Sequence, residues 1–263
     1  MTESAPGDTV LHRVVRILEA FEAGSASLSV TQIAGRTGLH IATASRLVEQ
    51  LVGHGLLSRD DDRRVRVGMR LWELGSRAAP TRDLREAAMP VLQDLHAVVG
   101  HHAQLGVLDG GEVLFVERLS APGAVVNYSR VAGRLPLHAS SSGLVLLAHA
   151  PSQLQEQVLT APLQIFTDQT IRDARQLRRV LADVRAHGFV HTPGHVHPAA
   201  AGVAVPVRDP RGAVVAALSV IVPDDPSAGA AVPALRAAAR AITRALGAAT
   251  PAYEEIPLSI LMQ

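Results

Sequence analysis

Residues 28–57 read LSVTQIAGRTGLHIATASRLVEQLVGHGLL, the pattern of two short amphipathic helices joined by a tight turn and followed by a strand. At the start of the first helix Ser29 can cap the backbone, while Gln32, three residues later, can reach back to the amide of the cap. Gly38 gives the turn the backbone freedom that it needs, and the second helix starts near His40. This order predicts a helix-turn-helix.

The second helix has two unlike sides. Leu47, Val48 and Leu51 recur at helical spacing and predict a buried face. The opposite side offers hydroxyls and the guanidinium of Arg46, which can enter a groove of DNA. We expect the following residues to contact DNA: Ser29, Thr31, Arg36, His40, Thr43, Ser45, Arg46, Arg64 and Arg66.

The segments on either side of this motif extend it to a winged helix-turn-helix over residues 1–78. Residues 56–59 and 64–67 read as two short strands joined by a polar turn. Upstream, an apolar stripe predicts a first helix on which the other two pack: Val10, Val14, Ile17, Leu18 and Phe21. The alternative is a small helical bundle whose turn resembles the motif by chance.

Composition limits what the rest of the chain can be. The 263 residues exceed what one core usually fills, so we expect two domains, and 48% apolar content allows both to have cores. The absence of cysteine excludes disulfides and thiolate chemistry. All 25 basic residues are Arg and the net charge is only +1, so phosphate contacts depend on where the arginines lie. Without a secretory or membrane-spanning pattern, we expect a soluble cytoplasmic protein with no membrane partner.

Residues 79–97 are expected to form a linker helix. Its apolar residues alternate at four- and three-residue spacing and form a narrow seam: Leu84, Ala88, Val91, Leu95 and Val98. The seam favours a contact between two copies of the chain, and packing against a second core is the alternative. Pro90 either kinks this helix or starts a new one.

Residues 98–263 show strand-like and helical patterns in turn. We expect strands over 102–108, 112–119, 124–130, 202–207 and 213–222, and helices over 142–150, 173–187 and around 235–246. An antiparallel sheet with helices beside it follows, and the whole chain is a mixed α/β protein of the α+β type. The tail after Pro251 is uninformative.

Taken together, these motifs resemble those of the IclR family of transcriptional regulators. The resemblance covers about residues 10–222 and includes SVTQIAGRTGL at 29–39, LGVLDGGEVLFVER at 105–118, YSRVAGRLPLHASSSG at 128–143 and PVRDPRGAVVAALSV at 206–220. It implies a GAF-like effector-binding domain over 98–263, homodimers or homotetramers, and a response to a small organic acid. It further implies binding to a near-palindromic duplex operator, more often as a repressor, with neither enzyme activity nor a cofactor.

The resemblance also implies where the organic acid binds. Carried across, the ligand positions of the family fall on Ser141, Ser142, His191, Thr192, Gly202, Ser219 and Ile221, and we expect Tyr128 to help enclose the acid. Amides at the start of the Ser142 helix would hold a carboxylate, and the apolar walls favour an aromatic or branched acid. The alternative is that Ser140, Ser141 and Ser142 only cap a helix and that Ser219 only satisfies its neighbours. Where the family often has Pro-Lys-Ser, this chain has His40-Ile41-Ala42, so we expect a different operator sequence. A second departure lies in the effector loop, where Gly202 stands in place of the family's Cys.

The rival hypothesis is a zinc enzyme or a zinc-dependent sensor. His191, His195 and His197 could supply imidazole ligands, but spacings of four and two match no strong zinc motif, and we expect no metal site. A serine hydrolase is disfavoured because the G-x-S-x-G elbow is absent.

Overall fold

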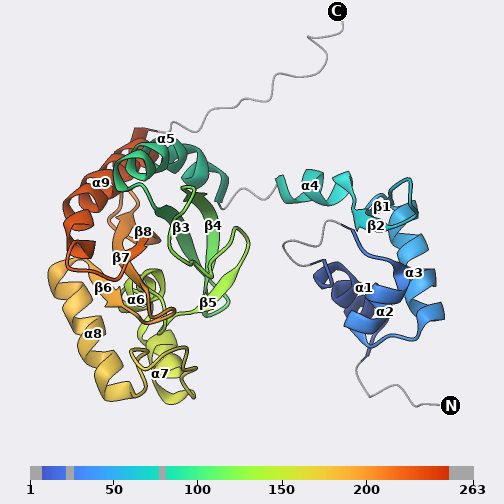
Figure 1. Ribbon diagram of the computed structural model, residues 1–263, viewed down its shortest axis with the longest axis horizontal. Coiled ribbons are helices and arrows are strands. Elements are labelled where there is room, and N and C mark those ends of the chain that lie inside the picture. The colour runs from blue at the N-terminus through green and yellow to red at the C-terminus, as the bar shows by residue number, and fades with distance from the viewer. Residues whose placement is uncertain (1–7, 22–26, 77–80, 249–263) are drawn as a thin grey trace, which may run out of the picture. The chain divides into compact units, whose positions relative to one another are not determined.

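The computed structural model describes residues 8–21, 27–76 and 81–248, and the chain divides into two compact units, residues 1–79 and 80–263 (Figure 1). The expected boundary between residues 78 and 79 and the tail after Pro251 lie outside the described residues. No described helix is both long and apolar enough to cross a membrane. Each unit has its own hydrophobic core.

The N-terminal unit contains the expected helix-turn-helix: α1 Val10–Glu19, α2 Val30–Thr37 and α3 Ile41–Gly53. Ser29 Oγ accepts from the Gln32 amide at 3.1 Å, and the Ser29 amide donates to Gln32 Oε1 at 2.9 Å, so the predicted capping box is confirmed. Gly38 ends α2 with φ of 67°, the left-handed conformation that favours glycine. The helices close on a common core that includes Ile17, Ile33 and Leu47.

The wing follows α3. Strands β1 Leu57–Arg59 and β2 Val65–Val67 pair antiparallel, and Leu28 bridges to Val65, which ties the wing to the start of the motif. Helix α4 Met69–Ser76 comes next and was not predicted. Its large apolar residues Met69 and Trp72 are exposed, so it lacks the buried face that periodicity detects.

Removing the cap should weaken the N-terminal unit alone. We expect Ser29→Ala to lower its free energy of unfolding by about 1 kcal/mol, because the Gln32 amide loses its acceptor. Urea unfolding followed by circular dichroism measures this change. Ser58→Ala, on exposed wing sequence, is the matched control. An equal loss in the control would contradict the role assigned to the cap.

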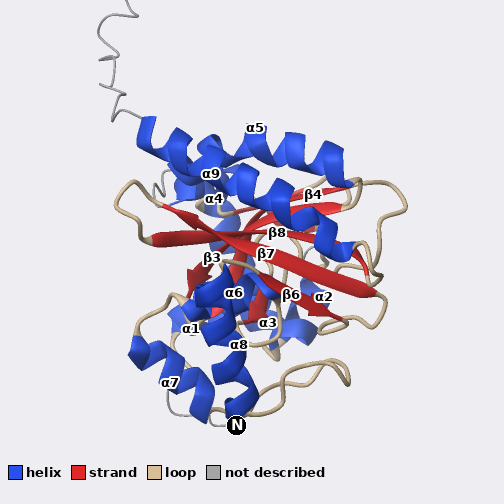
Figure 2. Cartoon of the chain, turned by 90° about the vertical axis from the view of Figure 1, so that its left-hand side faces the viewer, coloured by secondary structure: helices blue, strands red, loops and turns tan. Residues whose placement is uncertain are grey.

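The C-terminal unit is built on one antiparallel sheet with the order β5-β4-β3-β8-β7-β6. Its strands are β3 His102–Asp109, β4 Glu112–Ser120, β5 Arg134–Pro136, β6 Val190–Pro193, β7 Ala200–Arg208 and β8 Val214–Pro223. The helices are α5 Arg82–Val99, α6 Ser141–Ala148, α7 Ser152–Thr160, α8 Ala174–His187 and α9 Val232–Ala248, with a 3-10 turn η2 at Ala228–Ala231. Figure 2 shows α5 and α9 over one face of the sheet and α6, α7 and α8 on the other.

Both faces of the central strands are therefore buried. In β7, Ala201, Val203 and Val205 belong to the core shared with α5 and α9, whereas Ala204 belongs to the core around α6. This explains why β7 reads as a continuous run of small and β-branched residues rather than as an alternation of polar and apolar ones. The whole of α6 is buried between the sheet and α8.

The strand predicted over 124–130 is wrong. These residues form no strand, and the edge of the sheet is the short β5 instead. The β-branched pair Val125-Val126 made the segment resemble a strand, but side chains satisfy its backbone, among them His102, which contacts the Val125 carbonyl at 2.6 Å. The short β6 and the helix α7 were not predicted.

Helix α5 runs unbroken through Pro90, which lies on its exposed side, so no new helix starts there. Leu84, Ala88 and Leu95 of the expected seam are buried in the core with the sheet and α9, whereas Val98 is 77% exposed. The helix packs against the second core, the alternative given above. A contact of α5 with a second copy of the chain stays a prediction.

Candidate nucleic-acid interface and ligand pocket

Helix α3 presents an open polar side. Its buried residues are Ala44, Leu47, Val48 and Leu51. Arg46 is exposed on the other side, and within the described residues it has no hydrogen bond or ion pair. His40 starts the helix, because its Nδ1 accepts from the Ala42 amide at 3.4 Å. Thr43 and Ser45 are half-buried beside Arg46.

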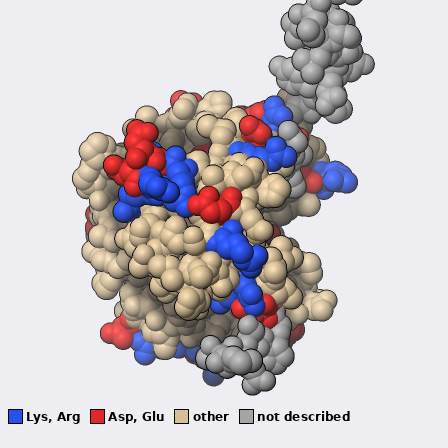
Figure 3. Space-filling model, turned by 90° about the vertical axis from the view of Figure 1, so that its right-hand side faces the viewer, with Lys and Arg blue, Asp and Glu red and all other residues tan. Residues whose placement is uncertain are grey.

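The other arginines expected at DNA are already engaged within the N-terminal unit. Arg36 donates to the Ala20 carbonyl at 2.7 Å, and Arg64 donates to both Ser27 Oγ and the Ser27 carbonyl, at 2.8 and 2.9 Å. Arg66 pairs with Asp60 at 3.0 Å. Figure 3, viewed from the side of this unit, shows arginines interspersed with carboxylates.

Ser29 and Thr31, which were also expected to contact DNA, differ in whether their hydroxyl is available. Ser29 uses its hydroxyl for the cap of α2, whereas Thr31 is exposed in the first turn of that helix. Among the described candidates Arg46 is therefore the cation with most freedom to meet a base or a phosphate.

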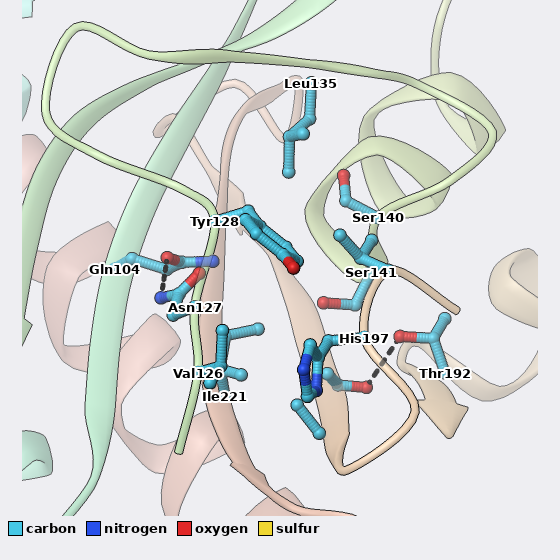
Figure 4. A pocket seen from close by; sticks show the side chains of 13 residues that line it. Gln104, Val126, Asn127, Tyr128, Leu135, Ser140, Ser141, Thr192, His197 and Ile221 are labelled. Carbon is cyan, nitrogen blue, oxygen red and sulfur yellow. Dashed lines mark hydrogen bonds between the residues drawn. The ribbon is translucent and has the colours of Figure 1, made fainter. Parts of the chain in front are cut away.

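A pocket opens in the C-terminal unit at the amino end of α6 (Figure 4). Its lining comes from the sheet, from α6 and from the two loops beside them: Gln104, Val126, Asn127, Tyr128, Leu135, Ser140, Ser141, Thr192, Val196, His197, Ala200, Gly202 and Ile221. The volume of the pocket is about 40 Å³. A benzene-sized ligand needs more room than this, so part of the lining must move when such a ligand enters.

The polar groups of the pocket gather at the start of α6. Ser140 caps the helix by accepting from the Gly143 amide at 3.1 Å, as its alternative role supposed. Ser141 Oγ is buried and has no hydrogen-bond partner among the residues that the structure describes, and the first amides of a helix have no partner within it. Unpaired donors at a helix start favour an anion.

Gly202 lies in the wall of the pocket, at a position with no room for a Cβ atom. A Cβ atom added there would lie 2.6 Å from Ser141 Oγ and 2.8 Å from Thr192 Oγ1. Thr192 Oγ1 is fixed, because it donates to the Gly202 carbonyl at 3.1 Å. Only glycine therefore keeps this wall open.

Of the expected ligand residues, the structure brings together Tyr128, Ser141, Thr192, Gly202 and Ile221. The other three do not line the pocket. Ser142 donates to Ser219 at 2.8 Å behind it, with both side chains fully buried, and His191 is exposed on β6.

Sequence reasoning missed several lining residues. Gln104 is a polar residue between the apolar Ala103 and Leu105 of β3, and this contrast could have marked it as a candidate. Asn127 lies in the segment mistaken for a strand, and nothing in the sequence sets Val196 or Ala200 apart from core residues.

The three candidate zinc ligands, His191, His195 and His197, lie in different environments. His191 is exposed, while burial lowers the pKa of His195 to about 4, with nearby His191 adding to the shift. The His197 ring lies 5.9 Å from the Tyr128 ring at the pocket. Within the described part of the chain, no group of three or more His, Cys, Asp or Glu residues could hold a metal ion. The zinc hypothesis therefore has no geometric support.

Comparison with known proteins matches both units. Residues 10–61 match the IclR helix-turn-helix domain, and residues 76–247 match the C-terminal domain of the bacterial transcriptional regulator IclR. The chain is 32% identical over 247 residues to the HTH-type transcriptional regulator XynR of Escherichia coli, covering 90% of this chain and 96% of that protein. It is 30% identical over 217 residues to the HTH-type transcriptional repressor AllR of Klebsiella pneumoniae, covering 81% of this chain and 79% of that one.

A solved structure is similar along the whole length of its chain. The crystal structure of an IclR homologue from Microbacterium hydrocarbonoxydans in complex with 4-hydroxybenzoate is 44% identical. The match has a TM-score of 0.87 and covers 92% of this chain and 100% of that chain.

Proposed function

The chain belongs to the IclR family of transcriptional regulators, and from this we propose that it represses transcription until an aromatic carboxylate binds its C-terminal domain. Membership makes it a regulator with a helix-turn-helix DNA-binding domain and an effector-binding domain, and not an enzyme. The proposal adds the class of effector, the sign of regulation and the form of the operator. It includes a cytoplasmic location, where operator DNA is found.

The observation that carries the choice of effector is the buried Ser141 Oγ at the start of α6, which has no hydrogen-bond partner in the described part of the chain. This hydroxyl and the amides of the first turn can donate to a carboxylate. Val126, Leu135 and Ile221 supply apolar surface for a ring. The similar homologue bound to 4-hydroxybenzoate supports an acid of this kind, and a small polar acid would have no apolar surface to set against these walls.

The proposed operator is near-palindromic and is bound by a homodimer or homotetramer. Two-fold symmetric regulators place one recognition helix in each half-site. The exposed apolar residues Val10, Leu11 and Val15 on α1 support contact with a second copy, since soluble proteins seldom leave such surfaces uncovered. The similarity to a relative named as a repressor supports the proposed sign of regulation.

We expect the full chain to select a near-palindromic sequence from random duplex DNA and to release it when 4-hydroxybenzoate is added. Coupling between the two sites should change operator affinity by about 5- to 150-fold, and operator DNA should change affinity for the acid by the same factor. Fluorescence anisotropy measures the first change and calorimetry the second. The amide 4-hydroxybenzamide is the matched control, because it lacks the carboxylate. Selection of no sequence would contradict the proposed operator, and an equal response to the amide would contradict the carboxylate site.

A further inference from the structure

The segment between β4 and β5, residues 121–133, covers the pocket, and we call it the mouth loop. It contributes Val126, Asn127 and Tyr128 to the lining, and Figure 4 shows the Tyr128 side chain directed into the pocket. Tyr128 is nevertheless 58% exposed, so packing alone holds it weakly. No strand forms in residues 121–133, and their position depends on individual hydrogen bonds.

A chain of hydrogen bonds leads to this loop from the neighbouring strands. Arg118 Nε donates to Ser120 Oγ at 2.9 Å, and Ser120 Oγ lies 2.9 Å from His102 Nδ1. His102 Nε2 lies 2.6 Å from the Val125 carbonyl oxygen. Arg118 also donates to the Ser129 carbonyl, so the residues on both sides of Tyr128 are held.

The hydrogen-bond partners fix the tautomer of the neutral His102 ring. A carbonyl only accepts, so Nε2 carries the hydrogen and donates to Val125. In the neutral ring Nδ1 then accepts the Ser120 hydroxyl, whose oxygen accepts from Arg118. Burial lowers the pKa of His102, and the Val125 carbonyl opposes this shift. Three nearby basic residues lower it further, Arg118 on β4, His101 before β3 and His96 on α5. The lowered pKa of His102 favours the neutral ring at pH 7.

We propose that His102 is a positioning residue of the effector pocket, which through its bond to Val125 holds the mouth loop with Tyr128 over the bound acid. The effect on affinity rests on the proposed function, whereas the anchoring of the loop does not. The half-buried Val125 carbonyl would lose its donor, and an unpaired acceptor gains by moving into water. A variant without the donor should therefore open the loop rather than leave it in place.

Hydrogen exchange of the full chain tests whether His102 anchors the mouth loop. Mass spectrometry measures the exchange of peptides within residues 121–133. His102→Phe should raise exchange of the loop about tenfold, and Ser120→Ala should raise it less. His102→Gln keeps an amide N–H near the position of Nε2 and should restore the slow exchange. His138→Phe is the matched control, because His138 and His102 are both 4% exposed and His138 Nε2 contacts the Gln164 carbonyl outside this loop.

The same variants test the consequence for the effector. Calorimetry with 4-hydroxybenzoate should show about tenfold weaker binding for His102→Phe, near-normal binding for His102→Gln, and operator affinity without the acid unchanged in both. Unchanged loop exchange in both His102→Phe and Ser120→Ala, or no rescue by Gln, overturns the proposal. Unchanged acid affinity with an open loop also overturns it. If the wild-type protein does not bind the acid, only the proposed function is contradicted. Hydrogen exchange of the ligand-free protein still tests whether His102 anchors the mouth loop.

Discussion

Gly202→Ala should abolish the response to an aromatic acid at concentrations that saturate the wild type, and leave operator binding intact. The added methyl group would lie 2.6 Å from Ser141 Oγ, closer than real Cβ atoms approach, and 3.1 Å from Ser141 Cβ, which is tighter than most such contacts. Ser141 can turn its hydroxyl away, but its Cβ belongs to the buried first turn of α6 and cannot. Overpacking of this kind costs about 1–3 kcal/mol. At Gly202 the added methyl group takes up space that the ligand needs, so we expect this cost to appear as weaker ligand binding. We expect acid affinity to fall by about 100-fold, the upper part of that range.

Calorimetry with 4-hydroxybenzoate measures this loss, and operator affinity verifies that the variant is folded. Gly229→Ala is the matched control: no atom lies within 4 Å of the Cβ position there, and its φ is not positive. Normal acid binding by Gly202→Ala would mean that the ligand does not lie against β7, and the pocket would be wrongly assigned.

Arg46→Ala should weaken operator binding by about 100-fold or more in a dimer, since removing a specific arginine–base interaction from each half-site costs about 1–3 kcal/mol per site. The reason lies in the contrast among the arginines of the N-terminal unit. Arg36, Arg64 and Arg66 hold this unit together, whereas Arg46 is free among the described residues. Fluorescence anisotropy on the selected operator measures the effect.

Arg46→Lys separates the two kinds of contact. A lysine keeps the charge for a phosphate but lacks the planar, rigid fork of the guanidinium, so it holds guanine less well. If Arg46 reads a base, both variants lose affinity and sequence preference, and the salt dependence changes little. If it contacts a phosphate, Lys restores binding, and Ala lowers the salt slope by about 1. Arg175→Ala, an exposed arginine of α8, is the control. A full-strength complex with Arg46→Ala would contradict the role of α3.

The sequence predicted the N-terminal unit better than the pocket, and the reason is physical. Helix starts, the turn at Gly38 and the wing depend on residues a few positions apart, so local chemistry specifies them. The mouth loop depends on bonds to strands about twenty residues away, such as that from His102 to Val125, and its own residues gave no sign of them.

The serines before α6 show a finer limit. The sequence predicted a helix near Ser142, but α6 begins at Ser141 with Ser140 as its cap. A shift of one residue turns a helical side chain by about 100°, so it decides which serine faces a cavity. Ser141 lines the pocket, while Ser142 turns towards Ser219 behind it. Periodicity shows which side of a helix is buried and not whether a cavity lies there.

The two halves of the pocket differ in how freely mutation can change them over generations. Each residue of α6 is buried, and an added Cβ at Gly143 would lie 2.4 Å from the Leu137 carbonyl, so most substitutions there would cost the fold itself. Val126 and Tyr128 project from the mouth loop and are half exposed, so their replacement costs little stability. We therefore expect descendants of this chain to acquire new effectors through the mouth loop, while the anion-binding end of α6 is inherited unchanged.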